Sequence, residues 1–336
     1  MLSYEEFTEE LVHQIPDYLP AELQERGLEI QPIVATNDTK RDALTPAGTS
    51  EGMSSKPVMY LDEIYRQYQE HNLDVQEMCR IVADEMKKSI NRAPNPDLID
   101  KQITLDHAFI SMINLEANKE YLKSVPHLVY GDLAVVYKIP VSEKTMGQGA
   151  VTITKSLMEK KGWSPELLFI SACENMRNEL LVTRMEDTLF PEPEAGKTEF
   201  GFDELSDLPE SETNMFVVSN RSRFWGDGVF LMQEELGKLS EKLDASLVVI
   251  PSSVHETIVV PDRGDDFAKD CLLMVKEVNQ STVDPKEQLS NSVYRFDRDS
   301  QKLERYGQDG SVQEMKLVNP EAERKVSDRS KGGSAR

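Results

Sequence analysis

The apolar positions at the start of the chain have the spacing of an α-helix. Apolar side chains three or four residues apart share one face of this segment: Tyr4, Phe7, Leu11 and Ile15. Ser3 followed by Glu6 is a capping-box pattern, in which each side chain binds a free backbone N–H group at the helix start. Pro16 and Pro20 end this helix, because proline interrupts the helical hydrogen bonds.

The rest of the first hundred residues predicts one short strand, one long loop and two more helices. We expect the strand at 28–34, and the segment 36–56, rich in Thr, Ser, Gly and Ala, resembles a surface loop. The later of these two helices follows Asp74, a favourable N-cap, and has an apolar face: Val75, Met78, Cys79, Val82, Met86 and Ile90. Residues 1–100 are therefore interpreted as a helical amino-terminal region.

Strand patterns dominate residues 101–185. Four runs there are rich in β-branched and aromatic residues: FISMINL, HLVY, LAVVYKI and GAVTIT. Ser164 and Pro165 then supply an N-cap and a first-turn proline for a helix. We expect a sheet followed by a helix in this region.

An acidic segment at 186–212 separates this region from the next. It holds ten acidic residues against one lysine, Lys197, together with three prolines. Like charges and prolines are typical of an exposed connection. The segment is therefore the predicted boundary between two compact regions.

The clearest pattern lies within 213–318. A strand at 215–219, a helix that includes Leu236 and Leu239, and a strand at 247–250 indicate a βαβ crossover with two parallel strands. A strand at 257–260 follows after only six residues and is expected to turn back antiparallel. A further helix, a hairpin and a disordered tail at 319–336 complete the prediction. The fold class is therefore α+β with a mixed sheet.

Composition and charge exclude some functions. The net charge of -22 disfavours direct binding to nucleic-acid phosphates. No apolar run approaches the length needed to cross a bilayer, and the acidic start lacks the basic region of a signal peptide, so we expect a cytoplasmic protein. Cys79, Cys173 and Cys271 are far apart and are expected to be reduced core residues.

Polar side chains follow both strands of the predicted crossover. Because parallel strands end at the same edge of a sheet, ligand sites of open α/β sheets often form there. The side chains at this edge are Asn220, Arg221, Ser252, Ser253, His255 and Glu256. Ser252, Ser253, His255 and Glu256 are the candidate catalytic residues, since hydroxyl, imidazole and carboxylate groups can position a ligand or an attacking water. The alternative is that these residues only form the turn.

Four residues are the candidate ligand-binding groups: Asn220, Arg221, His127 and Asp132. His127 and Asp132 flank the start of the run LAVVYKI and can approach His255 only through tertiary contacts. Their spacing does not form a metal motif, so we expect no metal site, and the sequence does not identify a cofactor. Cys173 lies in mid-helix without an adjacent basic group and is interpreted as an apolar residue rather than a nucleophile.

Several runs of the sequence resemble an uncharacterised domain-of-unknown-function family of anaerobic Firmicutes. The runs are IPSSVHETIVVP at 250–261, PHLVYGDLAVVY at 126–137, ELLFISACENM at 166–176 and LSNSVYRFD at 289–297. The resemblance extends over most of the chain. It implies a bacterial cytosolic protein and carries no established activity, cofactor or catalytic residue.

Three functional hypotheses follow. The first is an accessory protein that acts through a protein partner, and it depends on the acidic surface, the acidic 186–212 segment and the absence of a recognised catalytic motif. The second is a hydrolase or transferase that uses Ser252, Ser253, His255 and Glu256. The third, an acidic mimic of nucleic acid, is disfavoured because the acids are spread along the chain. Whether the protein is an enzyme is left open by the sequence.

Overall fold

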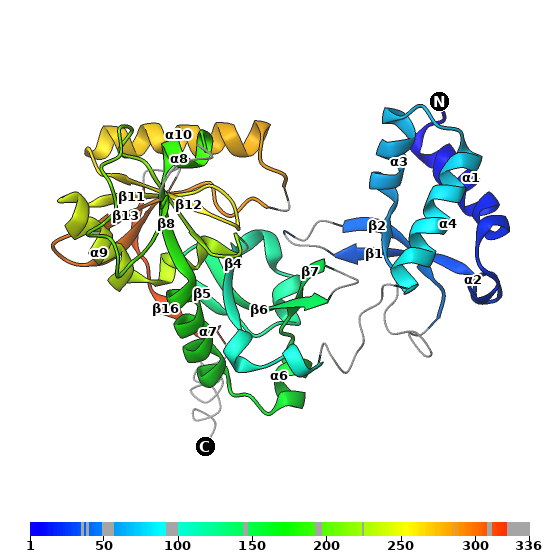
Figure 1. The fold of residues 1–336 in the computed structure, drawn as a ribbon, viewed down its shortest axis with the longest axis horizontal. Coiled ribbons are helices and arrows are strands. Elements are labelled where there is room, and N and C mark those ends of the chain that lie inside the picture. Colours follow the sequence, from blue (N-terminus) through cyan, green and yellow to red (C-terminus); the bar gives the residue numbers. More distant parts are fainter. Residues whose placement is uncertain are drawn as a thin grey trace, which may run out of the picture. The chain divides into compact units, whose positions relative to one another are not determined.

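The computed structural model contains two compact units (Figure 1). It describes residues 1–34, 37, 40–48, 57–91, 100–143, 147–191, 197–223, 225–285, 287–307 and 311–320. The first unit comprises Met1–Ile103 and Val141–Ala150, and the second comprises Thr104–Pro140 and Val151–Arg336. Most of the predicted tail, from residue 321 onward, lies outside the described residues.

The first unit combines helices with a small antiparallel sheet. Its helices are α1 (Tyr4–Gln14), the 3-10 helix η1 (Ile15–Tyr18), α2 (Ala21–Arg26), α3 (Leu61–Glu70) and α4 (Val75–Asn91). Its strands, in sheet order, are β1 (Leu28–Val34), β2 (Lys40–Pro46) and β3 (Met59–Tyr60). The capping box of α1 is present, with Ser3 Oγ accepting from the Glu6 amide and Glu6 accepting from the Ser3 amide. Asp74 caps α4 through a 2.7 Å bond from the Glu77 amide.

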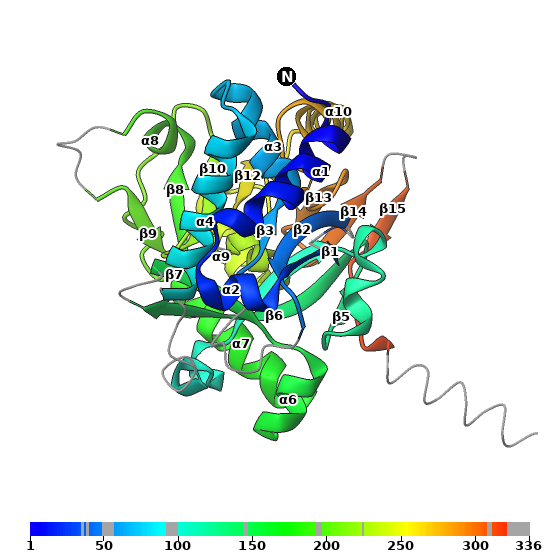
Figure 2. The same ribbon diagram turned by 90° about the vertical axis from the view of Figure 1, so that its right-hand side faces the viewer.

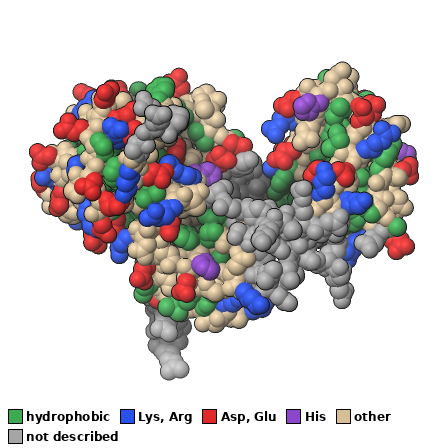
Figure 3. Space-filling model, viewed as in Figure 1, with side chains coloured by type: hydrophobic (Ala, Val, Ile, Leu, Met, Phe, Trp, Pro, Cys, Tyr) green, Lys and Arg blue, Asp and Glu red, His purple; other side chains and the backbone are tan. Residues whose placement is uncertain are grey.

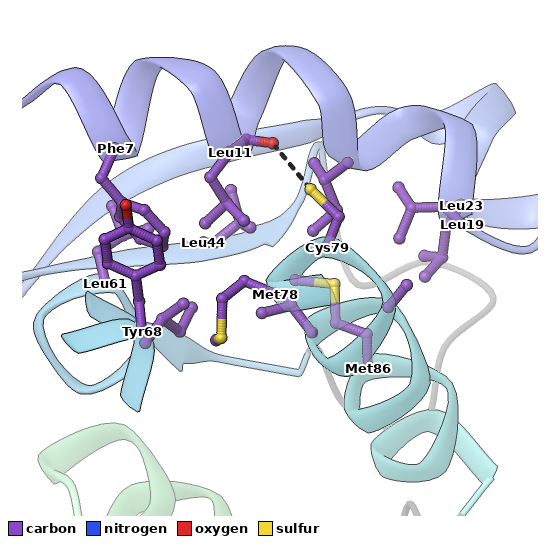
Figure 4. Close-up of a cluster of buried hydrophobic side chains, with 14 residues drawn as sticks. Phe7, Leu11, Leu19, Leu23, Leu44, Leu61, Tyr68, Met78, Cys79 and Met86 are labelled. Carbon is purple, nitrogen blue, oxygen red and sulfur yellow. Dashed lines mark hydrogen bonds between the residues drawn. The ribbon is translucent and has the colours of Figure 1, made fainter. Parts of the chain in front are cut away.

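The predicted helical faces form the core of this unit (Figure 4). Phe7 and Leu11 of α1 pack with Met78 and Met86 of α4, and all four are fully buried. Cys79 is one of these core residues, and its Sγ lies 3.9 Å from the carbonyl oxygen of Leu11. Burial raises the pKa of this thiol to about 11, so Cys79 behaves as a small apolar side chain.

The loop predicted at 36–56 is only partly a loop. Its residues 40–46 form β2, which pairs with β1 along seven residues from Leu28↔Pro46 to Val34↔Lys40. Ala43 and Leu44 are fully buried beneath the helices. The local sequence KRDALTP has little β-branched content, so pairing and burial rather than propensity make it a strand. Residues 49–56 lie outside the described part of the chain.

The second unit is built on an eight-stranded sheet. Its strands in spatial order are β15 (Val312–Glu314), β14 (Lys302–Tyr306), β13 (Val293–Asp297), β11 (Leu247–Pro251), β12 (Thr257–Pro261), β10 (Phe216–Asn220), β8 (Leu180–Arg184) and β9 (Glu199–Gly201). Figure 2 shows the predicted hairpin of β13 and β14 beside β15. The helices of this unit are α6 (Lys155–Lys161), α7 (Pro165–Glu179), α8 (Met185–Leu189), α9 (Gln233–Leu243) and α10 (Asp265–Ser281).

The α+β class is confirmed, whereas the predicted mixed sheet is wrong in its pairing. Strands β10 and β11 run in the same direction, with α9 between them in the sequence, but β12 lies between them in the sheet. Every neighbouring pair of these eight strands is therefore antiparallel. The short 252–256 turn brings β12 back beside β11. In a simple βαβ crossover, β10 would occupy that position.

A second, smaller sheet belongs to the same unit. Its strands are β16 (Leu317–Val318), β5 (Leu128–Tyr130), β6 (Leu133–Glu143) and β4 (Phe109–Asn114), with β7 (Gly147–Thr152) paired to β6. The end of β6 from Val141 and the start of β7 to Ala150 are assigned to the first unit. The described pairings β4–β6, β5–β6 and β16–β5 are antiparallel. The described part of the unit also contains short 3-10 helices: η3 (Leu105–His107), η4 (Glu116–Asn118), η5 (Tyr121–Lys123) and η6 (Gly226–Leu231).

The acidic segment 186–212 does not lie between two compact units. Its described part contains β9, which pairs with β8. Phe200 within β9 is buried, and so are three apolar side chains after it: Phe202, Leu205 and Leu208. The two units separate near residue 103 instead. The sequence analysis predicted an exposed segment because acidic residues predominate there, and the four buried apolar residues are widely spaced among them.

Asp132 connects the two sheets of the second unit. Its carboxylate accepts hydrogen bonds from Ser290 Oγ at 2.7 Å, Ser292 Oγ at 3.1 Å and Tyr294 Oη at 2.8 Å. Arg305 lies 3.7 Å from the same carboxylate. Asp132 stands in the turn between β5 and β6, while its partners come from β13 and its flanks. A carboxylate that accepts three hydrogen bonds therefore fixes the position of one sheet against the other.

The strand and helix cores of this unit are buried as expected. Val217, Val248 and Ile250 are at most 3% exposed, and Leu236 and Leu239 are fully buried. Val248 and Ile250 belong to a cluster beneath α10, which crosses one face of the large sheet (Figure 1). In the described part of the chain, no helix combines the length and the apolar character that crossing a membrane requires.

Replacing Asp132 with alanine is expected to destabilise the protein by about 1–3 kcal/mol, because three hydroxyl donors lose their acceptor. Urea unfolding of Asp132→Ala measures this change, and Asp106→Ala, at an exposed position, is the control. A loss below about 0.5 kcal/mol would show that water replaces the carboxylate at little cost.

Truncating Leu239 tests the helix that precedes β11. Leu239→Ala should lower the free energy of unfolding by about 2–5 kcal/mol, since it leaves a cavity at a fully buried position. Lys242→Ala, on the exposed side of α9, should change it by less than about 0.5 kcal/mol. Equal effects of the two substitutions would contradict the assigned packing of α9.

Candidate functional site

The predicted polar edge exists in the second unit. Strands β10 and β11 both pair antiparallel with β12, so their carboxyl ends lie at the same edge. Asn220 ends β10, and the turn 252–256 connects the end of β11 to the start of β12. The sequence therefore located this edge through strand direction, although the pairing differs from the prediction.

The backbone carbonyl of His255 is anchored to β10 and η6. It accepts hydrogen bonds from Ser219 Oγ at 2.8 Å and from the Gly226 amide at 3.0 Å. A Cβ atom at Gly226 would lie 2.5 Å from both the His255 carbonyl oxygen and Ser219 Oγ. Glycine is thus required where η6 approaches the turn.

The two candidate serines bond within the turn. Ser252 Oγ donates to Glu256 Oε1 at 3.2 Å, and Ser253 Oγ accepts from the His255 amide at 3.1 Å. A serine nucleophile requires a base that hydrogen-bonds its hydroxyl. The hydrogen bonds of Ser252 and Ser253 described above are those of a turn, and neither joins a serine hydroxyl to the imidazole of His255.

Asn220 and Arg221 occupy different environments. Asn220 is 2% exposed, and its Oδ1 accepts from Ser222 Oγ at 3.0 Å. Arg221 points away toward α7, where its Nε lies 3.7 Å from Glu179 Oε2. The Arg221 side chain is 63% exposed, so it forms a surface ion pair rather than part of a closed pocket.

The imidazole of His255 is half-buried among charged groups. Burial lowers the pKa of His255 below its ordinary value of 6.5. The charge of Lys138 lowers this pKa further, while Glu287 and Glu256 oppose the shift. The neutral imidazole is therefore the favoured form near neutral pH.

Two residues beside this edge were missed by the sequence analysis. Asp227, in η6, is fully buried, and its Oδ2 accepts from the Met112 amide of β4 at 3.0 Å. Lys138 lies in β6, and its Nζ is 4.9 Å from the centroid of the Trp225 ring. The charge of Lys138 acts on both Asp227 and His255. The sequence feature that could have indicated Lys138 is the presence of a lysine within the apolar run LAVVYKI.

His127 and Asp132 have partners elsewhere in the unit. His127 Nδ1 lies 3.2 Å from the Val125 carbonyl oxygen, and the residue lines a cavity of about 90 Å³ with Tyr137 and Lys155. Asp132 binds Tyr294 and the serines beside it. Neither has a described hydrogen bond or ion pair with His255 or Glu256, so a shared site of the four groups stays a prediction.

The described residues contain no group of three or more His, Cys, Asp or Glu side chains that could hold a metal ion. Cys173 lies within α7, where burial raises the pKa of its thiol to about 11. The thiolate form that a nucleophile needs is therefore disfavoured.

A separate groove borders α10 and the segment before β10. It encloses about 260 Å³. Its apolar lining consists of Met215, Ile250, Val260, Phe267, Cys271 and Met274, and its polar lining consists of Thr213, Asn214, Arg263 and Asp270. Met274 is 41% exposed, and Val278, one turn further along α10, is 40% exposed. This α10 groove therefore presents apolar surface to solvent.

The model of a family of unknown function, DUF5688, matches residues 4–298. The chain belongs to this family. Comparisons with curated proteins and with solved structures found no match. The DUF5688 match includes segments of both compact units, the polar edge and the α10 groove.

The lowered pKa of His255 predicts a pH dependence of stability in this DUF5688 chain. The pKa of His255 is lower in the folded protein than in the unfolded chain. At a pH between these two pKa values, the unfolded chain therefore binds more protons than the folded protein. The free energy of unfolding consequently falls as the pH decreases below about 6.5. Urea midpoints at pH 7.5 and 5 should therefore decrease less in His255→Gln than in the wild type. An equal decrease in both proteins would exclude His255 as a contributor.

Proposed function

We propose that the chain is a bacterial, cytoplasmic accessory protein that acts by binding a protein partner through the α10 groove. The observation that carries this proposal is a groove of about 260 Å³ with six apolar lining residues. Hydrophobic pockets of this kind receive the side chains that anchor protein interfaces. The free cysteines Cys79, Cys173 and Cys271 support a reducing cytoplasm.

The charge around the groove favours a basic partner segment. Asp270 lines the groove, and Thr213, also in its lining, donates to the carboxylate of Glu186 at 3.1 Å. Among the described residues that line the groove, Arg263 is the only cationic one, and its guanidinium lies 5.3 Å from the Phe267 ring centroid. The whole chain carries a net charge of -22. A segment with apolar anchors and flanking lysines or arginines therefore complements this site better than nucleic acid does.

On the face that Figure 3 shows, Asp and Glu side chains are interspersed with Lys and Arg side chains. Such mixing supports local recognition at a groove rather than mimicry of a continuous phosphate backbone. The acidic net charge then increases the association rate of a basic partner, and this effect weakens as salt is added.

Two adjacent residues of α10 provide a matched test. Met274 lines the groove, whereas Leu273 is 67% exposed and does not line it. Peptides selected by display on the wild-type protein should combine apolar and basic residues. Their affinity, measured by fluorescence anisotropy, should fall at least about tenfold in Met274→Glu, because a carboxylate would enter the apolar floor.

Leu273→Glu adds the same charge to the same helix and should retain binding within about twofold, a change of about 0.4 kcal/mol. Circular dichroism must show that both variants are folded. Equal losses in the two variants would indicate a purely electrostatic attraction and contradict docking in the groove. Selection of peptides without apolar anchors would do the same.

A further inference from the structure

A small cavity lies where α6 and the start of α7 meet the small sheet (Figure 1). It encloses about 90 Å³, about three times the volume that one water molecule takes in the liquid. Its walls come from the segment 126–128, β6, α6, the first residue of α7 and Asn319, all within the second unit. Glu159 and Pro165 are exposed, so the cavity opens to solvent beside them.

Backbone hydrogen bonds hold the walls of this cavity in place. The Lys155 amide at the start of α6 donates to the Ser124 carbonyl oxygen at 3.0 Å, which ties α6 to the segment before β5. The Ile153 amide donates to the Tyr137 carbonyl oxygen at 2.9 Å, which ties the chain entering α6 to β6. Sites for small molecules are usually preformed in this way.

Tyr137 presents an unpartnered hydroxyl group to the cavity. The residue is 2% exposed, yet its hydroxyl group has no hydrogen bond with the described residues. The oxygen is also not among the polar atoms that the described protein encloses completely, so it touches open space, and the cavity is the open space that Tyr137 lines. Most buried polar side chains have a partner, so this hydroxyl group indicates the place of a polar ligand. Burial raises the pKa of Tyr137, and the hydroxyl group therefore keeps the proton that it can donate.

His127 lines the same cavity with an imidazole of defined tautomer. Its Nδ1 lies 3.2 Å from the Val125 carbonyl oxygen, and a carbonyl oxygen only accepts, so Nδ1 carries the proton. Nε2 of the neutral imidazole is then an acceptor. It has no hydrogen bond within the part of the chain that the structure describes. The ring therefore adds an acceptor to the donor that Tyr137 supplies.

Two opposite charges complete the lining. Lys155 and Glu159 are four residues apart in α6, and both line the cavity. Side chains at this spacing lie on the same face of a helix. A ligand with one charge would be attracted by one of these groups and repelled by the other. A ligand that carries both charges complements the pair.

We propose that this cavity binds a small zwitterionic amino acid, of which glycine fits best. The Tyr137 hydroxyl group and Lys155 bind its carboxylate, because both can donate hydrogen bonds to it. Glu159 and the imidazole of His127 accept hydrogen bonds from its ammonium group. The volume of about 90 Å³ excludes amino acids with long side chains.

Ligand selectivity tests the proposal on the full-length protein. Saturation-transfer difference NMR measures the dissociation constants of glycine, methylamine and acetate, of which the last two each carry one half of the zwitterion. Glycine should bind at least about tenfold tighter than either, because both of its charged groups form hydrogen bonds. Leucine should not displace glycine, because its side chain exceeds the cavity.

Two matched pairs of variants test the contacts. Tyr137→Phe keeps the ring but removes the hydroxyl group, and should weaken glycine binding at least about tenfold. Tyr121→Phe removes a hydroxyl group outside the lining, which donates to Thr152 Oγ1 at 3.3 Å, and should leave binding unchanged. Glu159→Gln should weaken glycine binding at least about tenfold without weakening acetate binding. Glu166→Gln, at an exposed position of α7 outside the lining, should change neither.

Urea unfolding separates a ligand site from a structural role. Because the Tyr137 hydroxyl group has no partner among the described residues, Tyr137→Phe without glycine should keep the urea midpoint of the wild type. A lower midpoint would show that the hydroxyl group serves the fold and would contradict the proposal. The proposal is also wrong if glycine binds no tighter than methylamine and acetate, or if Tyr137→Phe and Tyr121→Phe weaken binding equally. Absence of glycine binding to the wild type would mean that the cavity holds only water.

Discussion

A buried carboxyl group between two sheets determines how the polar core of the second unit is arranged. Asp227 follows β10 of the large sheet and binds the Met112 amide of the small sheet. Because a buried donor without a partner costs about 1–3 kcal/mol, η6 cannot move away from β4 without a penalty. This contact places Trp225, Gly226 and the His255 turn around the end of β10. The geometry of the whole polar edge thus depends on it.

A second carboxylate fixes the same two sheets at another point. Asp132 collects hydroxyl donors from β13 and its flanks, whereas Asp227 binds a strand of the small sheet from the large-sheet side. Two anchors far apart in the sequence restrict rotation as well as separation of the sheets. Apolar packing supplies much of the free energy, and these directional bonds select one arrangement among those that bury similar area. The runs PHLVYGDLAVVY and LSNSVYRFD, which carried the family resemblance, meet at Asp132.

Local chemistry was sufficient to predict most elements but not their partners. The Ser3–Glu6 capping box and the Asp74 cap located α1 and α4 because capping involves residues only three positions apart. The position of β12 between β10 and β11 depends instead on which strand edge is free when the 252–256 turn closes. The residues of β2 become a strand only because β1 offers an edge and the helices offer a cover. Both outcomes are set by tertiary context, which hydrophobic periodicity does not encode.

The same distinction separates the predicted and missed parts of the site. Strand direction brought Asn220 and His255 to one edge, and that inference required only the crossover pattern. Asp227 and its Met112 partner are 115 residues apart, so no local spacing could reveal their contact. His127 and Asp132 can approach His255 only through tertiary contacts, which the sequence does not specify, and their described hydrogen bonds are to Val125 and to the residues around Tyr294. Long-range polar contacts are specific to one packing and cannot be read from one sequence.

The α10 groove and the polar edge lie at opposite ends of β10. Thr213 and Met215 of the groove precede β10, while Asn220 and Gly226 follow its last residues. Five residues of β10 at about 3.3 Å each separate these ends by about 17 Å. The strand is paired on both sides, by β8 and β12, and coupling between the ends would require this pairing to have two discrete arrangements. A central strand that is paired on both sides resists such a change, so binding in the groove is expected to leave the polar edge at the other end of β10 unchanged.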